Sequence, residues 1–449
     1  MAQSIVNAAH LLCVMLVLVV PGRSICAQNP GIPPKKLLIS SLHESPRLLQ
    51  LKKRIANGEA LALSQFWAAM PLEHSPLFEP ITNEPGRILV TFVWRAAPGT
   101  TDVGVFGRQM TRLLDTDLWF LTEVMDVSTP IFYAFFPTVK GESLGRVADP
   151  FNPNRFVVSD EVLSVIPQDL KGDNSQWLKT SMLLFRESPS ARCTDVHPGT
   201  PTGKIEMFTV EDKGNTRARR VWVYTPSDYH SDAKVPYRLL ICFNGPSYLI
   251  EIPVPTILDN LIASNEIWPM IAVMVDNGSA KAAAEDLDNH ALFADFIGKE
   301  LLPWIQKKWR VSTDPSHVIL CGFSRGGSGA AYVAWKHPEL FGNILAQSGA
   351  FWRGNEGGVE EPEWLTRQIK HSPKVGLRFY IDVGSQETRT TPGGPVFIDA
   401  NQHLVQALQE KGYPVRYIEV AGARHDPIHW RSQVPEGLLY LAGKETQAK

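Results

Sequence analysis

Apolar runs that read as β-strands alternate with helix-like stretches through the second half of the chain, and this alternation limits the fold more than any other feature. Each run ends in a turn signal; the runs are RRVWVYTP, RLLICFNG, MIAVMVDNG, HVILCGFS, NILAQSG, RFYIDVG and VRYIEVAG. Apolar residues recur at helical spacing in HALFADFIGKELLPWIQKKW, GSGAAYVAWKH and NQHLVQALQEKG. Strands that are apolar along their whole length are typical of a sheet covered on both faces by crossover helices. The sequence therefore predicts a mostly parallel α/β sheet over residues 201–445.

Residues 60–160 carry a different pattern. The runs RILVTFVWRAAPGT, TDVGVFG, DLWFLTEVMD and PIFYAFFPT read as short strands, with Gly, Pro and Asp turns at regular spacing. This pattern is typical of a small β-sandwich. We interpret residues 161–200 as a linker between the two domains, and two domains suit a chain of 449 residues. Trp94 and Trp119 are expected in the sandwich core rather than stacked on a sugar.

The N-terminus is predicted to be a signal peptide over residues 1–27. Its apolar core, LLCVMLVLVV, is shorter than the roughly 20 residues that a membrane-spanning helix needs. The stretch PGRSICAQ follows and offers a cleavage site after Ala27. We expect a secreted or periplasmic protein without stable membrane insertion; a retained anchor is the alternative.

Charge and cysteine content exclude several classes of partner. The formal net charge of -2 argues against nucleic acid as the main ligand, because binding to phosphates needs a basic surface. Cleavage would leave Cys193, Cys242 and Cys321, and the last two lie in strand-like runs where a buried thiol is expected rather than a disulfide. No paired Cys/His spacing points to a metal site, and no cofactor is predicted.

The decapeptide LCGFSRGGSG places Ser324 in a Gly-x-Ser-x-Gly motif between a strand-like run and a helix-like stretch. On a strand, tight turn and helix, such a serine is held in a strained conformation with its hydroxyl exposed. Glycines flank it because a side chain there would collide with neighbouring backbone. A helix N-cap is the alternative role for this serine. Its position at the carboxyl end of a strand, where α/β sheets carry functional loops, favours a nucleophile.

A nucleophilic serine needs a base, and the base needs an acid that orients it. Glu387 follows the run RFYIDVG and His425 follows VRYIEVAG, so both are predicted in loops beyond strand ends and in the order Ser, Glu, His. Asp382 is the competing acid, but it lies inside a strand run. The competing bases are His429 and His337, of which His337 reads as a helix C-cap. Asp426 is expected to anchor the loop beside His425.

The reaction also needs an oxyanion hole. One donor is predicted to be the backbone N–H of Arg325, the residue after the nucleophile. The other is predicted in the loop NGPSYL after RLLICF, where Pro246 has no N–H. Gly245 and Ser247 remain the candidates there, and we favour Gly245 because glycine allows the closest approach. A plain Asn-Gly turn is the alternative reading of this loop.

These residues resemble the enterochelin (ferric enterobactin) esterases, within the wider esterase D group. The resemblance rests on ELLPWIQKKW, CGFSRGGSGAAYVAWKHPELFGNILAQSGAFW, GSQE and GARHDPIHWR, and in the first half on FWAAM, VTFVWRA, DTDLWFLTEV, FYAFFP and DPFNP. It implies an α/β-hydrolase fold preceded by a small all-β sandwich. It also implies hydrolysis of the ester bonds of a cyclic catecholate trilactone, with Ser324 as nucleophile, Glu387 as acid and His425 as base.

The chain departs from the family pattern at two places. Family members usually have Asp-Gly with a nearby Trp, where this chain has Asn244-Gly245 and Tyr248. They also carry an arginine where this chain has Ala283, ahead of Asp286-Leu287. Such an arginine would suit an anionic ferric catecholate, and Arg325, Arg353 and Arg389 are the candidates to replace it. We assign substrate contacts to Arg325, Tyr248 and Trp352.

The leading hypothesis is a serine carboxylic-ester hydrolase that acts through an acyl-enzyme on a substrate like a catecholate siderophore. The second hypothesis keeps the chemistry but makes the substrate a feruloylated or acetylated carbohydrate outside the cell. The third is an inactive binding relative or an acyl-transferring one. Intact Ser324, Glu387 and His425 argue against an inactive domain.

Overall fold

The computed structural model describes residues 44–127, 130–156, 158–171, 179–183, 193–215, 217–288, 290–353, 361–391 and 394–444. The predicted signal peptide, residues 1–27, lies outside these ranges. Over the ranges that are described, no helix combines the length and the apolar character needed to cross a membrane.

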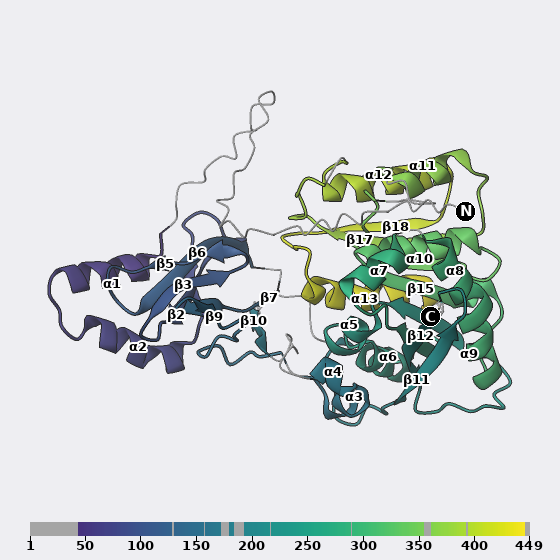
Figure 1. Ribbon diagram of the computed structural model, residues 1–449, viewed down its shortest axis with the longest axis horizontal. Helices are drawn as coiled ribbons and strands as arrows, with labels where there is room; N and C mark the ends of the chain where they lie inside the picture. Colours follow the sequence, from purple (N-terminus) through teal and green to yellow (C-terminus); the bar gives the residue numbers. More distant parts are fainter. Residues whose placement is uncertain are drawn as a thin grey trace, which may run out of the picture. The chain divides into compact units, whose positions relative to one another are not determined.

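An eight-stranded sheet forms the second half of the chain (Figure 1). Strands β11, β12 and β14 pair antiparallel, and every pair from β14 to β18 is parallel. All seven predicted strands are confirmed. The spatial order is β11 (Lys204–Asp212), β12 (Arg217–Thr225), β14 (Met270–Val275), β13 (Arg238–Phe243), β15 (Val318–Phe323), β16 (Asn343–Gln347), β17 (Arg378–Gly384) and β18 (Val415–Val420).

Alternate residues of each central strand enter different cores, because successive side chains of a strand point to opposite faces. In β13, Leu239 and Ile241 belong to one apolar cluster, and Leu240 and Cys242 belong to the other. The first cluster includes residues of α7 (Ala280–Leu287), α8 (Ala291–Asp295), α9 (Leu302–Lys308), α10 (Arg325–Lys336), α11 (Trp364–His371) and α12 (Phe397–Glu410). The second includes residues of α5 (Gly245–Ile250), α6 (Val254–Ala263) and α13 (Pro427–Ala442). Helices therefore cover both faces, which confirms the predicted α/β fold.

The sequence analysis named three helix-like stretches, and the structure has helices in all three. The first stretch differs in one respect from the prediction. The stretch HALFADFIGKELLPWIQKKW is divided into α8, a π-helical segment over Phe296–Leu301, and α9. Helix α13 was not predicted, since Pro435 and Gly437 lie inside it and both residues disfavour helix interiors. Its burial under the sheet, through residues such as Trp430 and Leu438, compensates for that composition.

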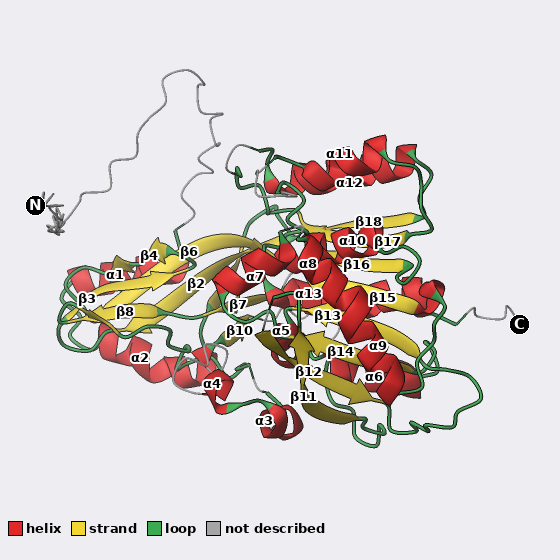
Figure 2. Cartoon of the chain, turned by 45° about the vertical axis from the view of Figure 1, so that its right-hand side comes forward, coloured by secondary structure: helices red, strands yellow, loops and turns green. Residues whose placement is uncertain are grey.

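Two four-stranded antiparallel sheets make up most of the N-terminal β domain (Figure 2). They share an apolar core that includes Val90, Phe92, Val103 and Trp119, which confirms the sandwich and places Trp119 in its core, with Trp94 packed against it. One sheet has the order β1 (Leu77–Pro80), β2 (Arg87–Arg95), β6 (Leu118–Asp126) and β5 (Thr111–Arg112). The other has the order β4 (Arg108–Gln109), β3 (Thr100–Val105), β8 (Phe136–Val139) and β9 (Glu142–Ser143).

Two helices that the sequence analysis did not predict pack against the first of these sheets. They are α1 (Pro46–Ala56), which begins after a Ser45 N-cap, and α2 (Ala62–Glu73). Leu51 and Trp67 from these helices share a cluster with Val93 and Leu118 of the sheet. The sandwich therefore has a helical layer on its outer face.

The described part of residues 161–200 contains regular structure. Helices α3 (Asp160–Val165) and α4 (Gln168–Lys171) precede β10 (Ser181–Leu183), which pairs with β7 (Ile131–Tyr133). The predicted boundaries, 60–160, 161–200 and 201–445, stay predictions. Cys242 and Cys321 are free and buried, as expected, and Cys193 is also buried.

Candidate active site

Ser324 lies in the turn between β15 and α10, where the motif predicted it. Its backbone is strained, with φ 53° and ψ -122°. A Cβ on Gly322 would lie 2.2 Å from the carbonyl oxygen of Gly326, and one on Gly326 would lie 2.1 Å from Asn244 Oδ1. Both glycines are therefore required by close approach, as the sequence predicted for this turn.

His425 and Glu387 are brought together by the loops after β18 and β17. The distance from His425 Nδ1 to Glu387 Oε2 is 2.5 Å. Glu387 Oε1 accepts hydrogen bonds from Ser348 Oγ at 2.6 Å and from the Gly384 amide at 2.8 Å. The Ser348 hydroxyl in turn accepts a bond from Trp430 Nε1 at 2.8 Å. The carboxylate is thus held in one orientation against the imidazole.

The surroundings of Glu387 favour its ionised form. Burial raises the pKa of Glu387, but the hydrogen bond and charge of His425 and the hydrogen bond from Ser348 lower it, and the resulting pKa lies below the ordinary value. The Glu387 side chain is 2% exposed, whereas that of His425 is 27% exposed. A buried negative charge beside a half-exposed imidazole is the arrangement that supports a general base.

Trp430 connects the serine turn to the histidine loop. Phe323, the neighbour of Ser324, stacks on the Trp430 ring at 4.2 Å between centroids. His425 meets the same indole edge to face at 4.9 Å. In the described structure no hydrogen bond joins Ser324 Oγ to the imidazole. Such bonds often form only when substrate is bound.

The rival histidines have structural roles. His429 is 1% exposed and both of its ring nitrogens are engaged: Nδ1 with the Arg424 carbonyl at 2.7 Å and Nε2 with Asp382 Oδ1 at 3.1 Å. Asp382, the rival acid, is fully buried and also accepts a bond from Gln347 Nε2 at 3.3 Å. His337 is the C-cap of α10, as predicted.

Asp426 anchors the loop beside His425, as expected from the sequence. Its side chain accepts a hydrogen bond from the Ile428 amide at 3.0 Å and caps α13. Burial raises the pKa of Asp426 to about 6. Asp426 therefore stabilises the start of α13 and does not orient the His425 imidazole.

The two predicted oxyanion donors begin helices on neighbouring strands. Arg325 is the first residue of α10 after β15, and Gly245 is the first residue of α5 after β13. Strands β13 and β15 pair directly, and amides at helix starts have no intrahelical partner. A Cβ on Gly245 would lie 2.7 Å from the Met274 carbonyl carbon, so glycine is required there. The assignment of the two amides stays a prediction.

The residues assigned to substrate differ in their exposure. Tyr248 is fully buried, and its hydroxyl donates to Gln347 Oε1 at 2.9 Å. This burial argues against the predicted substrate contact, because the apolar ring fills the core under the site. Trp352 is partly buried, and the Arg353 guanidinium lies 4.9 Å from its ring centroid.

The three candidate arginines are also not equivalent. Arg325 and Arg353 both pair with Asp288, at 3.2 and 3.4 Å. Arg389 is exposed and lies over the Phe397 ring at 5.1 Å, with no ion pair among the described residues. The Phe397 ring is 5.0 Å from that of His425. Of these three arginines, Arg389 is therefore the one without a carboxylate partner among the described residues, and the Phe397 ring connects it to His425.

Sequence reasoning missed a buried ionic network behind the site. The Arg219 side chain is 2% exposed and bonds to Asp212 and Asp286. Asp286 also accepts from Asn277 Nδ2 at 3.0 Å, and Asn277 Oδ1 accepts the Asn244 amide at 2.9 Å. The network thereby supports the loop that carries Gly245. The strand alternation in RARRVWV, which points Arg219 inward, was the only signal of it.

A contact from the N-terminal domain reaches the residue next to His425. Arg424 bonds to Glu123 Oε2 at 3.0 Å and lies over the Phe106 ring at 5.3 Å. His425 therefore lies in a loop that both domains contact.

The family profile described as "Putative esterase" matches residues 215–441, about half of the chain. The chain belongs to this esterase family. The match spans the sheet, the Ser324 turn and the His425 loop. As a member, the chain is a carboxylic-ester hydrolase by class.

Two curated relatives of this esterase cover most of its length. The iron(III) enterobactin esterase of Escherichia coli K12 is 24% identical over 395 residues, 82% of this chain and 94% of the relative. The iron(III) salmochelin esterase of Escherichia coli O6:H1 is 25% identical over 427 residues, 88% of this chain and 98% of the relative. The resemblance seen in the sequence is confirmed.

The solved structures agree on the fold of this esterase. The enterobactin esterase of Shigella flexneri, solved in the presence of enterobactin, has a TM-score of 0.65 at 24% identity and covers 82% of this chain and 96% of its own. Both domains of the chain thus have a counterpart of known fold.

Proposed function

We propose that Ser324, His425 and Glu387 form the catalytic triad of a serine esterase. His425 takes the proton of Ser324 while the hydroxyl oxygen attacks the ester carbonyl carbon, and it returns that proton to the departing alcohol. Water then attacks the acyl-enzyme by the same route. The N–H groups of Arg325 and Gly245 hold the oxyanion in both steps.

One observation carries this proposal: the 2.5 Å contact between His425 and a buried Glu387, in loops at the same sheet edge as the strained Ser324 turn. The pairing of His429 with Asp382 supports it further, because it removes the main rivals for both roles. No resident metal or cofactor enters these steps.

We further propose that the substrate is an ester of the catecholate-siderophore type, with any iron as part of the substrate. The support comes from the two relatives, whose names give enterobactin and salmochelin as the molecules they act on. Exposed Arg389 supplies a positive charge beside the His425–Glu387 pair, which suits an anionic ferric catecholate. Export through the predicted signal peptide would place the enzyme outside the cytoplasm.

A panel of esters tests the substrate class. We expect a catecholate trilactone, with and without iron, to be hydrolysed with a higher kcat/KM than feruloylated or acetylated sugars, and Ser324→Ala to remove all of these activities. Preferred turnover of the sugar esters would replace the siderophore assignment with the feruloyl or acetyl esterase hypothesis. Unchanged activity in Ser324→Ala would refute the nucleophile itself. N-terminal sequencing of the mature protein from fractionated cells tests export.

A further inference from the structure

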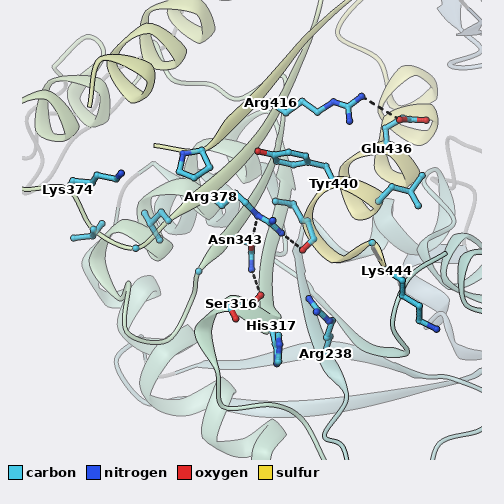
Figure 3. Close-up of a pocket in the computed structure, with 18 residues that line it drawn as sticks. Arg238, Ser316, His317, Asn343, Lys374, Arg378, Arg416, Glu436, Tyr440 and Lys444 are labelled. Atoms are coloured by element: carbon cyan, nitrogen blue, oxygen red, sulfur yellow. Dashed lines mark hydrogen bonds and ion pairs between the residues drawn. The ribbon is translucent and has the colours of Figure 1, made fainter. Parts of the chain in front are cut away.

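A large cavity opens at the amino ends of the parallel strands, at the opposite edge of the sheet from Ser324. Arg238, Asn343 and Arg378 are the first residues of β13, β16 and β17, and all three line it (Figure 3). Its volume is about 1090 Å³. A strand of six residues separates the two edges by roughly 20 Å, since each residue advances about 3.3 Å. The cavity is therefore separate from the site described above.

Positive charge dominates the lining of this cavity. Among the described residues that line it, Glu436 is the one carboxylate, against five cations, which are Arg238, Lys374, Arg378, Arg416 and Lys444. Glu436 and Arg416 approach only to 4.0 Å, and both side chains are about half exposed. Solvent weakens such a pair, so it offsets little of the local charge.

Neutral acceptors hold most of these cations in place. Arg378 Nε donates to Asn343 Oδ1 at 3.2 Å, and its terminal nitrogen donates to the Leu441 carbonyl. Lys374 donates to the Gly412 carbonyl at 2.6 Å, and Lys444 donates to the Asn265 side-chain oxygen. These bonds orient the charged groups but do not neutralise them.

Arg238 is the least satisfied of the five. It is half-buried, and its guanidinium has no hydrogen bond or ion pair to any described residue. Burial and the nearby Arg378 cation lower the pKa of Arg238, while Asp314, outside the lining, acts in the opposite direction. Two neighbouring guanidinium groups repel each other, so an anion placed between them would be stabilised by both.

The remaining guanidinium groups are arranged around one aromatic ring. Arg378 and Arg416 lie 5.3 and 5.9 Å from the centroid of Tyr440. Figure 3 shows the three side chains one above another, with Arg238 pointing up toward them from the opposite wall. A ring packed against long cationic side chains restricts their rotamers, so less side-chain entropy is lost when a ligand binds.

We propose that this cavity binds a small multivalent oxyanion, either a phosphate ester or an oligocarboxylate. The planar forks of three arginines match both groups, which accept paired hydrogen bonds. The concave shape favours a small molecule over an extended polymer. Its position at the amino ends of the strands leaves Ser324 free, so ester hydrolysis proceeds with the cavity empty or filled.

Calorimetric titration of the intact protein with inorganic pyrophosphate and with citrate tests this proposal. We expect one of the two to bind with one-to-one stoichiometry and to weaken as salt is added. Arg238→Gln should weaken binding about tenfold or more, since charge-assisted hydrogen bonds are lost. Lys307→Gln is the matched control, because it removes a positive charge from exposed α9, outside the cavity.

Arg416→Gln provides a second test on an exposed side chain, in case Arg238→Gln does not fold. It should weaken binding severalfold and leave hydrolysis of nitrophenyl acetate unchanged. Preference for pyrophosphate assigns a phosphate ester, and preference for citrate assigns an oligocarboxylate. Absence of binding at millimolar concentration overturns the proposal, and so does an equal loss of affinity in Lys307→Gln and the two cavity variants.

Discussion

The molecule contains two histidine–carboxylate pairs within a few residues of each other, His425 with Glu387 and His429 with Asp382. The distances are similar, 2.5 and 3.1 Å. Their surroundings are not: His425 is 27% exposed and has one ring nitrogen engaged with the carboxylate, whereas His429 is 1% exposed and has both nitrogens engaged. A free ring nitrogen at an open face can exchange protons with a substrate, and an enclosed one cannot.

The electrostatics of the two pairs differ in the same sense. The pKa of Glu387 is lowered below its ordinary value of 4.5, by His425 and Ser348 against the effect of burial. The pKa of Asp382 is raised above its ordinary value of 3.8, chiefly by burial, and that of His429 is raised above 6.5 by Asp382 despite burial. The first pair has the charge arrangement that the proposed triad requires, whereas the second pair is part of the buried core.

The largest expected effect is a difference between the two histidines. His425→Gln should lower kcat/KM by a factor on the order of 10⁴ or more, because the base is lost. His429→Gln should leave catalysis within about tenfold but lower the free energy of unfolding by roughly 3 kcal/mol, since it breaks a buried pair. Ester kinetics and denaturant unfolding of both variants measure this. The reverse order would move the base to His429.

The two acids should differ in the same direction but less strongly. Glu387→Gln should lower kcat by roughly 10³, because the imidazolium loses its counter-charge. Asp382→Asn should act mainly on stability, as its partners Gln347 and His429 are buried. A greater catalytic loss in Asp382→Asn, measured on folded protein, would assign the acid to that residue.

Sequence patterns predicted the sheet, the serine turn and the loops that carry Glu387 and His425, because each has a local signature. Gly322 and Gly326 mark the turn, and the strand runs fix where Glu387 and His425 follow. The pattern could not reveal what lies beside those residues in space. Ser348, which follows β16, and Trp430, in α13, hold Glu387 from other parts of the chain, and the buried Arg219–Asp286 pair spans 67 positions. Helix α13 escaped prediction since its internal Pro435 is compensated only by tertiary packing.

The pH dependence of stability should differ between the two pairs. The stability from Glu387 is lost toward acid, and the stability from His429 and Asp382 is lost toward alkaline pH. A lowered pKa means that the stability from Glu387 is present above 4.5 and is lost as the pH falls through its folded value. Raised pKa values mean that the contribution of His429 is present below 6.5 and is lost as the pH rises through its folded value, while that of Asp382 is lost from 3.8 upward.

Melting temperatures of the wild type, Glu387→Gln and the double variant His429→Gln/Asp382→Asn, recorded as a function of pH, measure these two dependences. The wild-type advantage over Glu387→Gln should shrink in acid, and its advantage over the double variant should shrink toward alkaline pH. Parallel curves for all three proteins would show that neither pair is linked to protons in this way.

A smaller effect on kcat is expected from changing Ser348, which holds Glu387 of the His425–Glu387 pair. Ser348→Ala removes one of the hydrogen bonds to Glu387 Oε1 and leaves Trp430 Nε1 without its acceptor. The loss should lower kcat about tenfold, in line with the 1 to 3 kcal/mol cost of an unsatisfied buried group. Ser328→Ala is a suitable control, because its hydroxyl bonds to the Arg325 carbonyl in α10 and not to Glu387. Equal losses would mean that Ser348 acts through packing alone.

The smallest effect is expected from a variant that tests whether the N-terminal domain helps to position the His425–Glu387 pair. Glu123 accepts one hydrogen bond from Arg424 and another from Arg108, so one buried carboxylate holds two arginines. Glu123→Gln keeps the shape and removes the charge. It should free the loop at Arg424 and lower kcat/KM two- to fivefold, because a loop contact of about 0.5 to 1 kcal/mol is lost. His429 keeps its hydrogen bond to the Arg424 carbonyl and limits the movement, which is why the effect is small. Arg108→Gln is the control: it removes the other ion pair of Glu123 and should leave the rate unchanged. If both variants reduced the rate equally, the carboxylate would act through the stability of the sandwich and not through the His425 loop.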